Sequence, residues 1–295
     1  MSTGTAATIA RALRLAARFL EEHGMAAPRF DAELLLSHTL GLRRLDLYLQ
    51  HDRRLAPAET ALFKERIRRR AVGEPVQYIL GEAHFRHLTL HVGPDVLIPR
   101  PETERLLDEI LSWAAVSQRD DLVLLDVGTG SGAIALAWLQ ELPRARAVAT
   151  DVSEAALAVA AVNAAEAGLA GRLELRAGDL LGPLRPGERF DAIAANLPYV
   201  ALHERSSLPI EVRDHEPELA LFGGRTGFEP TARLVTASPE WLAEGGLLAC
   251  EIAPAQSALA RGWVEATPGL RYIAAFRDHA GHERGFLAAQ VALRP

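Results

Sequence analysis

The stretch Leu122-Val-Leu-Leu-Asp126-Val-Gly128-Thr-Gly130-Ser-Gly132 decides the fold, because an apolar run leads directly into a glycine-rich loop. The residues that follow, 133–142, are mostly apolar and are predicted to form a helix. Glycines let a backbone turn tightly beside a ligand, and the free amides at the start of a helix point toward it. This order of strand, loop and helix predicts a nucleoside-binding site.

Strands and helices alternate beyond this loop. A helix is expected over 155–167, and the segments predicted as strands are 147–150, 173–175, 190–195 and 246–252. Nearly continuous apolar strands in this order predict an α/β fold, with a parallel sheet covered on both faces. Residues 271–277 and 285–292 are joined by only a short loop, which suits an antiparallel pair at the end of the sheet.

The N-terminal part of the chain has a helical pattern. Up to about residue 72 we expect three or four short amphipathic segments, separated by Gly24, Pro28, Gly41 and Pro57. The opening segment carries arginines without acids and can be read as a transit peptide. An amphipathic helix is favoured because the pattern continues through Glu21 and Glu22; its apolar stripe is Ile9, Leu13, Ala16 and Leu20.

The spacing of apolar residues changes at Gly73 from a helical to an extended pattern. Residues 84–92 are predicted to be one extended strand, and Gly93-Pro94 to turn the chain into a second strand at 96–98. Three parts follow from these patterns: a helical domain over 1–72, a β-hairpin linker over 73–99 and an α/β domain over 100–295.

Composition narrows the class of protein. The 295 residues are 49% hydrophobic and 24% charged, which is typical of a globular protein. No run approaches the 18 apolar residues of a membrane span. The lone Cys250 cannot form an internal disulfide, which favours a reducing, cytoplasmic location. It lies in the apolar run 247–250 and is predicted to be a buried small side chain rather than a nucleophile.

Charge is distributed unevenly along the chain. Residues 1–70 contain 13 Arg or Lys and 8 Asp or Glu, a net charge of +5, whereas the rest of the chain carries −11. The acidic part argues against binding duplex nucleic acid. The basic part can touch an acidic partner, but a solvated helix face formed by Arg66, Arg68, Arg69 and Arg70 is the favoured interpretation.

The glycine loop alone does not separate NAD from other nucleosides. Asp151 follows the next predicted strand, where a carboxylate can accept both ribose hydroxyls. The acid before the loop, Asp126, and the early third glycine resemble the pattern of methyltransferases that bind S-adenosylmethionine, which favours this ligand over NAD. The residues expected to bind it here are Gly128, Thr129, Gly130, Ser131, Gly132 and Asp151.

The chain has only two asparagines, Asn163 and Asn196. Asn196-Leu197-Pro198-Tyr199 follows the strand 190–195 and should face the same crevice as the glycine loop. The Asn196 side-chain oxygen and the Leu197 carbonyl can hold both N–H groups of an amide or amino group, and so aim its nitrogen at a methyl donor. Pro198 would stiffen the loop and Tyr199 would pack on a planar substrate. An asparagine-initiated turn is the structural alternative.

This motif is similar to that of amino-group methyltransferases, including ribosomal RNA adenine dimethylases. Four further segments, 73–81, 97–104, 215–224 and 278–284, resemble the HemK/PrmC family of peptide chain release factor glutamine methyltransferases. Together with the motif at 196–199, these five segments occur in the expected order. The resemblance implies a Rossmann-like, seven-stranded methyltransferase domain after a small N-terminal helical-bundle domain. It implies methyl transfer to N5 of the glutamine in the Gly-Gly-Gln motif of class 1 release factors.

By position, the resemblance places Asp179 and Leu180 beside the adenine and adds Asn196 to the residues that bind the donor. It also places Asn196 to Tyr199 around the substrate glutamine. This chain departs from the family pattern at Leu197, which replaces a proline, and at Leu180, where some relatives carry an aromatic residue. Ala253 replaces a common glycine. No metal is implied, and His84, His87 and His91 lack the cysteine or nearby carboxylate that would complete a zinc site.

Three alternatives remain open. An RNA or DNA adenine methyltransferase would use Asn196–Tyr199 to hold a flipped base. A ribosomal-protein glutamine methyltransferase would use the same amide chemistry. A nucleoside-binding adaptor without catalysis would act through its basic helices, and its activity would not depend on Asn196.

Overall fold

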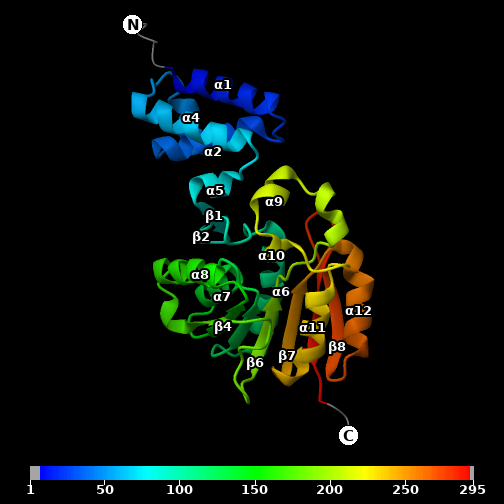
Figure 1. Cartoon of the computed structure of the whole chain (residues 1–295). Helices are drawn as coiled ribbons and strands as arrows, with labels where there is room; N and C mark the ends of the chain where they lie inside the picture. Colours follow the sequence, from blue (N-terminus) through cyan, green and yellow to red (C-terminus); the bar gives the residue numbers. More distant parts are fainter. Residues whose placement is uncertain (1–6, 293–295) are drawn as a thin grey trace. The chain divides into compact units, whose positions relative to one another are not determined.

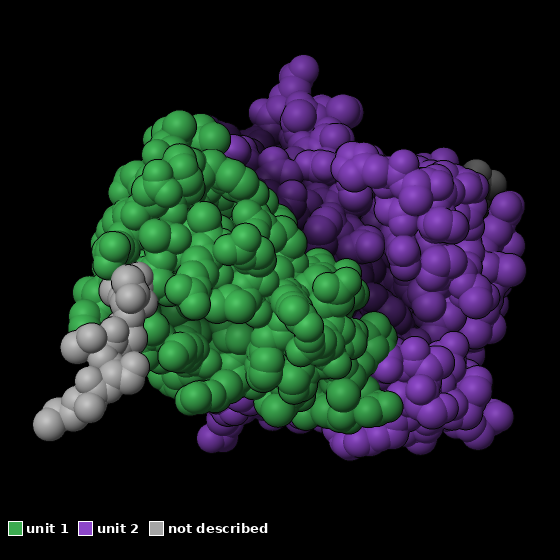
Figure 2. Space-filling view, turned by 90° about the horizontal axis from the view of Figure 1, so that it is seen from above, with its two compact units in different colours: residues 1–81, 209–215 green, residues 82–208, 216–295 purple. Residues whose placement is uncertain are grey.

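The computed structural model describes residues 7–292. The chain divides into two compact units, which Figure 2 colours separately: residues 1–81 with 209–215, and residues 82–208 with 216–295. The short segment 209–215 thus belongs to the N-terminal unit, although it lies far along the chain.

The first unit is helical. Its helices are α1 (Ile9–Glu22), α2 (Pro28–Leu40), α3 (Arg44–Leu49), α4 (Pro57–Ala71), α5 (Val76–Leu80) and α9 (Ile210–His215). The predicted stripe of α1 is confirmed: Ile9, Leu13, Ala16 and Leu20 are buried together with side chains of α2 and α4. Apolar residues at helical spacing thus build a core from α1, α2 and α4.

The expected solvated arginine face of α4 is wrong at Arg70. Helical spacing places Arg70 beside the buried Phe63 and Ile67, so it faces the core. Its guanidinium forms ion pairs of 2.7 Å with both Asp31 and Glu211. A buried arginine is tolerated only with such partners. Arg69 pairs with Glu74 and Arg66 donates to the Thr39 hydroxyl, which leaves Arg68 exposed.

The second unit is built on a seven-stranded sheet, as the family resemblance implies. Its spatial order is β5-β4-β3-β6-β7-β9-β8. The strands are β3 (Val123–Val127), β4 (Arg146–Asp151), β5 (Leu173–Ala177), β6 (Phe190–Ala195), β7 (Leu242–Glu251), β8 (Leu270–Arg277) and β9 (Glu283–Gln290). Strands β3 to β7 are parallel, and the predicted antiparallel pairing of the last two strands is confirmed.

Helices cover both faces of this sheet (Figure 1). Adjacent residues of β3, Leu124 and Leu125, belong to different core clusters because side chains alternate between the two faces of a strand. The helices are α6 (Pro101–Ser117), α7 (Ala133–Glu141), α8 (Glu154–Glu166), α10 (Glu218–Leu221), α11 (Glu229–Ala237) and α12 (Ser257–Ala266). Short 3₁₀ turns lie in connections between helices and strands: η1 (Ala170–Arg172), η2 (Leu202–Ser207), η3 (Ser238–Glu240) and η4 (Pro254–Gln256).

The linker hairpin differs from its prediction. The single strand expected over 84–92 is wrong, because the chain turns back at Arg86-His87 and forms β1 (Glu82–Phe85) and β2 (Leu88–His91). Residues 96–98 are not a strand. No glycine or asparagine marks the turn, and Arg86 adopts a left-handed φ of 51°.

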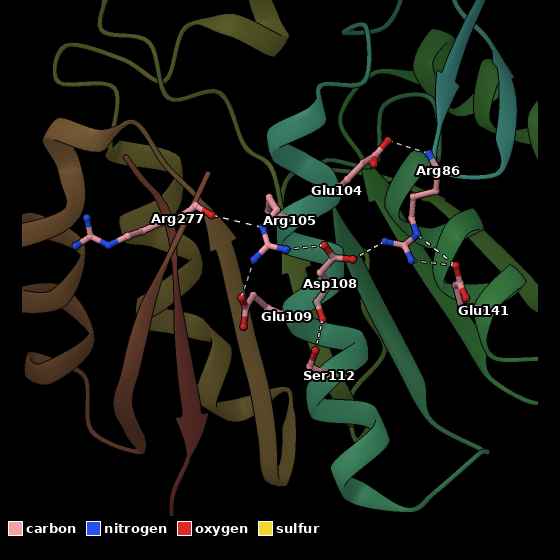
Figure 3. Close-up of polar contacts among 8 residues, drawn as sticks. All are labelled: Arg86, Glu104, Arg105, Asp108, Glu109, Ser112, Glu141 and Arg277. Atoms are coloured by element: carbon pink, nitrogen blue, oxygen red, sulfur yellow. Dashed lines mark hydrogen bonds and ion pairs between the residues drawn. The ribbon is translucent and has the colours of Figure 1, made fainter. Parts of the chain in front are cut away.

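Partners distant in sequence hold this turn (Figure 3). The Arg86 backbone amide donates to Glu104 at 2.9 Å, and its guanidinium contacts Asp108 and Glu141. Asp108 also accepts from Arg105, whose guanidinium reaches the Arg277 carbonyl at 3.5 Å. Helix α6 is therefore fastened to the hairpin on one side and to β8 on the other.

Cys250 lies inside the sheet, as predicted. It is 1% exposed, and burial raises the pKa of its thiol above the ordinary value, so it stays protonated. Among residues 7–292, no helix combines the length and apolar character needed to cross a membrane.

Candidate active site

A cavity of about 280 Å³ opens beyond the carboxyl ends of β3, β4, β5 and β6. This is where open α/β sheets bind ligands. Most of the residues predicted for the site line it: Gly128, Thr129, Gly130, Ser131, Asp151, Asp179, Leu180, Asn196, Leu197 and Pro198. Gly132 and Tyr199 are not among the lining residues.

The glycine loop owes its shape to left-handed backbone angles. Gly128 and Gly130 have φ of 74° and 55°, which side chains rarely permit. A Cβ on Gly128 would lie 3.0 Å from the Leu197 side chain, so the loop packs closely against the second motif. Gly132 also has a left-handed φ, of 84°, and it allows close packing, since a Cβ there would lie 3.2 Å from Leu136.

Asp151 at the end of β4 holds the loop and also faces the cavity. One carboxylate oxygen accepts from the Gly130 amide and the other from the Ser153 amide, both at 2.9 Å. Each carboxylate oxygen can accept a second hydrogen bond. Asp151 can therefore receive hydroxyl groups of a ligand while the loop stays in place.

Asp126 stabilises the glycine loop from a buried position, through hydrogen bonds. It is fully buried and does not line the cavity. One of its oxygens accepts from the Thr129 hydroxyl at 2.7 Å and from the Ala135 amide at 3.2 Å. Burial raises the pKa of this carboxyl group to about 6, because the charged form loses its hydration.

Asp179 and Leu180 follow β5 at another wall of the cavity. Asp179 forms a 2.5 Å ion pair with Arg233, and both residues line the cavity. Leu180 has a left-handed φ of 50°, and its carbonyl accepts from the Thr150 hydroxyl at 3.0 Å. An unusual backbone angle held by a hydrogen bond is typical of a residue placed for function.

Asn196 is held by a hydrogen bond to α6. Its side-chain amino group donates to the Thr103 hydroxyl at 2.9 Å. Thr103 in turn donates to the Glu251 carboxylate at 2.7 Å, and the Tyr199 hydroxyl donates to the other Glu251 oxygen at 3.3 Å. Within the described part of the chain, nothing donates to the Asn196 side-chain oxygen, which leaves it free to accept from a substrate.

Thr103 and Glu251 were not predicted as site residues. Parallel pairing of β6 with β7 aligns Ala195 with Cys250, so the next residues, Asn196 and Glu251, lie side by side. Glu251 is 1% exposed, and burial raises its pKa to about 7. The signal in the sequence is a carboxylate placed directly after the apolar run 247–250.

Asn163, the other asparagine, lies outside the cavity and connects two segments. Its side-chain oxygen accepts from the His91 amide at 2.6 Å, and its amino group donates to the Ser131 and His91 carbonyls at 2.8 and 3.1 Å. Helix α8 thereby ties the linker hairpin to the glycine loop. Among the described residues, no group of three or more side chains is placed to hold a metal ion.

Family models match two segments of the chain. A PrmC N-terminal domain matches residues 11–81, and a methyltransferase domain matches residues 124–214. The chain is similar to two proteins named release factor glutamine methyltransferase. The one from Rhodopirellula baltica is 38% identical over 96% of both chains, and the one from Moorella thermoacetica is 42% identical over 95% of this chain and 98% of that one.

Solved structures share the fold at low sequence identity. A methyltransferase from Pyrococcus furiosus superposes with a TM-score of 0.51 at 17% identity, covering 70% of this chain and 91% of that one. The hMettl16 catalytic domain, solved with a 3′UTR hairpin, gives 0.54 at 15% identity, covering 77% and 82%. These similarities confirm a methyltransferase fold for the larger unit.

Proposed function

Because this chain belongs to the release factor glutamine methyltransferase family, we propose that it methylates the side-chain amide nitrogen of a release factor glutamine. The methyl donor is S-adenosylmethionine, and we place the glutamine in the Gly-Gly-Gln motif of class 1 release factors. One observation carries the proposal: the free oxygen of Asn196 lies at the same cavity as the glycine loop.

The cavity residues fit the donor. Gly128 to Ser131 form a loop without side-chain bulk at its glycines, and a Cβ on Gly130 would meet no atom within 4 Å. Asp151 offers its second lone pairs to ribose hydroxyls, and Asp179 with Leu180 would flank the adenine. When bound, S-adenosylmethionine supplies a methyl group on a positively charged sulfur.

The second motif accounts for the acceptor. An amide nitrogen is a weak nucleophile because its lone pair is shared with the carbonyl group. The Asn196 side-chain oxygen and the Leu197 backbone carbonyl would accept both of its N–H groups, orienting the nitrogen and stabilising the positive charge that develops on it. The amide loses its proton after attack, so no general base is needed.

Pro198 and the half-buried Tyr199 would complete this arrangement. Pro198 lines the cavity and fixes one backbone angle beside Leu197. Tyr199 is anchored through its hydroxyl to Glu251, and its ring would pack on the planar substrate group. The leucine at position 197 keeps the carbonyl acceptor that a proline would also supply.

Adenine methylation is the second candidate, because the same acceptors can hold an exocyclic amino group. The net charge of −11 over residues 71–295 disfavours it, since nucleic-acid binding needs clustered cations. The family relationship favours glutamine. A ribosomal-protein glutamine remains a further substrate to be tested in the same assay.

Two parts of the proposal concern the rest of the molecule. We propose that the N-terminal helical unit recognises the release factor away from its Gly-Gly-Gln loop, because that loop is too short to supply much specificity. We also place the protein in the cytoplasm, where release factors act. Its partner is then a protein and neither a nucleic acid nor a membrane.

Mass spectrometry tests the proposed function. Purified release factor is incubated with the protein and S-adenosylmethionine, and the Gly-Gly-Gln peptide is examined for one added methyl group on glutamine. RNA and ribosomal proteins are offered in parallel with labelled donor. An unmodified Gly-Gly-Gln peptide, together with label in either competitor, would overturn the assignment.

A further inference from the structure

Two buried side chains, Thr103 and Glu251, join the half-buried Asn196 in one series of hydrogen bonds. They come from different elements: Thr103 from the first turn of α6, Asn196 from the residue after β6, and Glu251 from the end of β7. Thr103 and Glu251 are 4% and 1% exposed. The methyl-transfer mechanism described above uses Asn196, does not use Thr103, and uses Glu251 only as the anchor of the Tyr199 hydroxyl.

The direction of these hydrogen bonds, from donor to acceptor, follows from the single proton of a hydroxyl group. Thr103 has one proton, and it donates that proton to the Glu251 carboxylate at 2.7 Å. Its oxygen is then an acceptor toward Asn196, so it must meet the amino group of that side chain, as it does at 2.9 Å. The Asn196 carbonyl oxygen is left for another partner.

Shape alone cannot fix this orientation. The oxygen and the amino group of an asparagine are nearly identical in size, so a half-turn of the side chain changes only its hydrogen bonds. A reversed Asn196 would present N–H groups to the N–H groups of the substrate amide, and the acceptor would be lost.

From these contacts we infer that Glu251, acting through the Thr103 hydroxyl, is a positioning residue that keeps the Asn196 oxygen directed at the substrate amide. The inference rests on the proposed methyl transfer. It adds two residues that act on the reaction through Asn196: Thr103, which also lines the cavity, and Glu251, which does not.

The surroundings of Glu251 favour this role. The Tyr199 hydroxyl occupies one carboxylate oxygen, which directs the other toward Thr103. Burial and the nearby charge of Glu102 raise the pKa of Glu251 to about 7, although Arg284 and the two hydroxyl donors act in the opposite direction. Its protonation state therefore changes near neutral pH.

Protonation would reverse the chain of hydrogen bonds. A neutral Glu251 can donate to Thr103, whose own proton then turns toward Asn196 and favours the reversed side chain. We expect kcat to fall as the pH decreases through about 7, because the ionised carboxylate is the form that orients Asn196.

Substitutions at Thr103 separate hydrogen bonding from packing. Thr103→Val keeps the shape but loses the hydroxyl, and should lower kcat for release factor roughly 10- to 100-fold, less than removal of a directly contacting group. The affinity for S-adenosylhomocysteine, measured by calorimetry, should change less than about threefold. Thr103→Ser restores the hydroxyl and should recover most of kcat.

Thr267→Val is the matched control. Thr267 is equally buried, at 7% exposure, but donates to the Trp263 carbonyl in α12 and does not line the cavity. Its kcat should match that of the unmodified protein. A Thr103→Val enzyme with unchanged kcat, or a Thr103→Ser enzyme as impaired as the valine variant, would overturn the inference.

The pH profile of Glu251→Gln supplies the second readout. The unmodified protein should lose kcat on the acidic side of about pH 7, and the glutamine variant should have a lower kcat without that acidic loss. Persistence of the same acidic loss in the variant would refute the role of Glu251. The unmodified protein must methylate release factor in every series, and its failure to do so would instead refute the proposed function.

Discussion

At the scale of residues, the two asparagines show how differently one side chain can be used. Among residues 7–292, the Asn196 side chain has one hydrogen-bond partner, Thr103; its oxygen receives no hydrogen bond, and the residue lines the cavity. Asn163 uses both ends of its amide on backbone groups and is 2% exposed. The first arrangement suits binding, and the second suits structural support.

Substitution of Asn196 tests its role in the reaction. Asn196→Ala removes an acceptor of the substrate amide and should lower kcat for release factor about 10²- to 10³-fold. Donor affinity should stay within about threefold, because Asp151 and the glycine loop are untouched. Single-turnover methylation and calorimetry measure the two effects. Full methylation activity in the alanine variant would show that the reaction does not need the Asn196 oxygen as an acceptor.

Asp126 should make stability depend on pH. Its pKa is raised from 3.8 to about 6 in the folded protein, so the folded state binds more protons than the unfolded state between these values. The free energy of unfolding should therefore fall as the pH rises through this window, by about 2 to 3 kcal/mol from this group. Its contribution is fully lost above about pH 6.

Asp126→Asn isolates that contribution. The amide cannot ionise but keeps an oxygen for the Thr129 hydroxyl and the Ala135 amide. Urea unfolding at pH 4 and pH 7 gives the difference in unfolding free energy between the two proteins. This difference should shift in favour of the asparagine variant at pH 7, and a pH-independent difference would contradict the prediction.

The types of residue in the sequence identified only part of the site. The glycine loop and Asn196 stand out because strained backbone and a rare side chain leave local signals in the sequence. Neither Thr103 nor Glu251 is marked in the sequence by a strained backbone or by a rare type of side chain. Their roles depend on the β6–β7 register and on the position of α6, which only the folded structure provides.

At the scale of elements, hydrophobic pattern predicted the sheet well. The strand expected at 190–195 matches β6, and the helix expected at 155–167 differs from α8 by one residue at each end. The hairpin was mispredicted because its turn at Arg86 depends on Glu104, Asp108 and Glu141 rather than on local turn residues. The alternation of apolar and polar residues over 84–92 is compatible with one strand or with two.

Asn163 gives a test of how elements are joined. Asn163→Ala leaves the His91 backbone and the Ser131 carbonyl without this partner, and should lower the free energy of unfolding by about 2 to 4 kcal/mol. Binding of S-adenosylhomocysteine should weaken, because Ser131 lines the cavity. Urea unfolding and calorimetry measure both effects.

Val162→Ala is the control for that substitution. Val162 neighbours Asn163 on α8 but is 48% exposed, so its truncation should change stability by less than about 0.5 kcal/mol. Equal losses of unfolding free energy in the two variants would show that stability depends on α8 as a whole rather than on the hydrogen bonds of Asn163.

At the scale of the whole molecule, the uneven charge corresponds to the two units. The basic residues of 1–70 lie in the helical unit, and the acidic remainder carries the methyltransferase fold. Charge counting indicated this division. It missed the segment 209–215, because nothing in its composition shows that Glu211 pairs with Arg70.

Removal of the helical unit tests its proposed role in recognition. A variant lacking residues 1–81 should lose at least about tenfold more kcat/KM for intact release factor than for a short Gly-Gly-Gln peptide. The peptide assay is the control for damage around 209–215, which loses its packing partners. Equal losses on both substrates would argue against a recognition domain.

The return of residues 209–215 to the first unit affects the order of events during synthesis. Among the described residues, the buried apolar cluster of that unit lies between Ile9 and Ile79, so it can form as soon as these residues leave the ribosome. Glu211 emerges only after the 127 residues from 82 to 208. At 5–20 residues per second this delay is roughly 6 to 25 s. During that time Arg70 can pair with Asp31 but not yet with Glu211. The N-terminal unit is therefore completed after most of the parallel sheet has been translated.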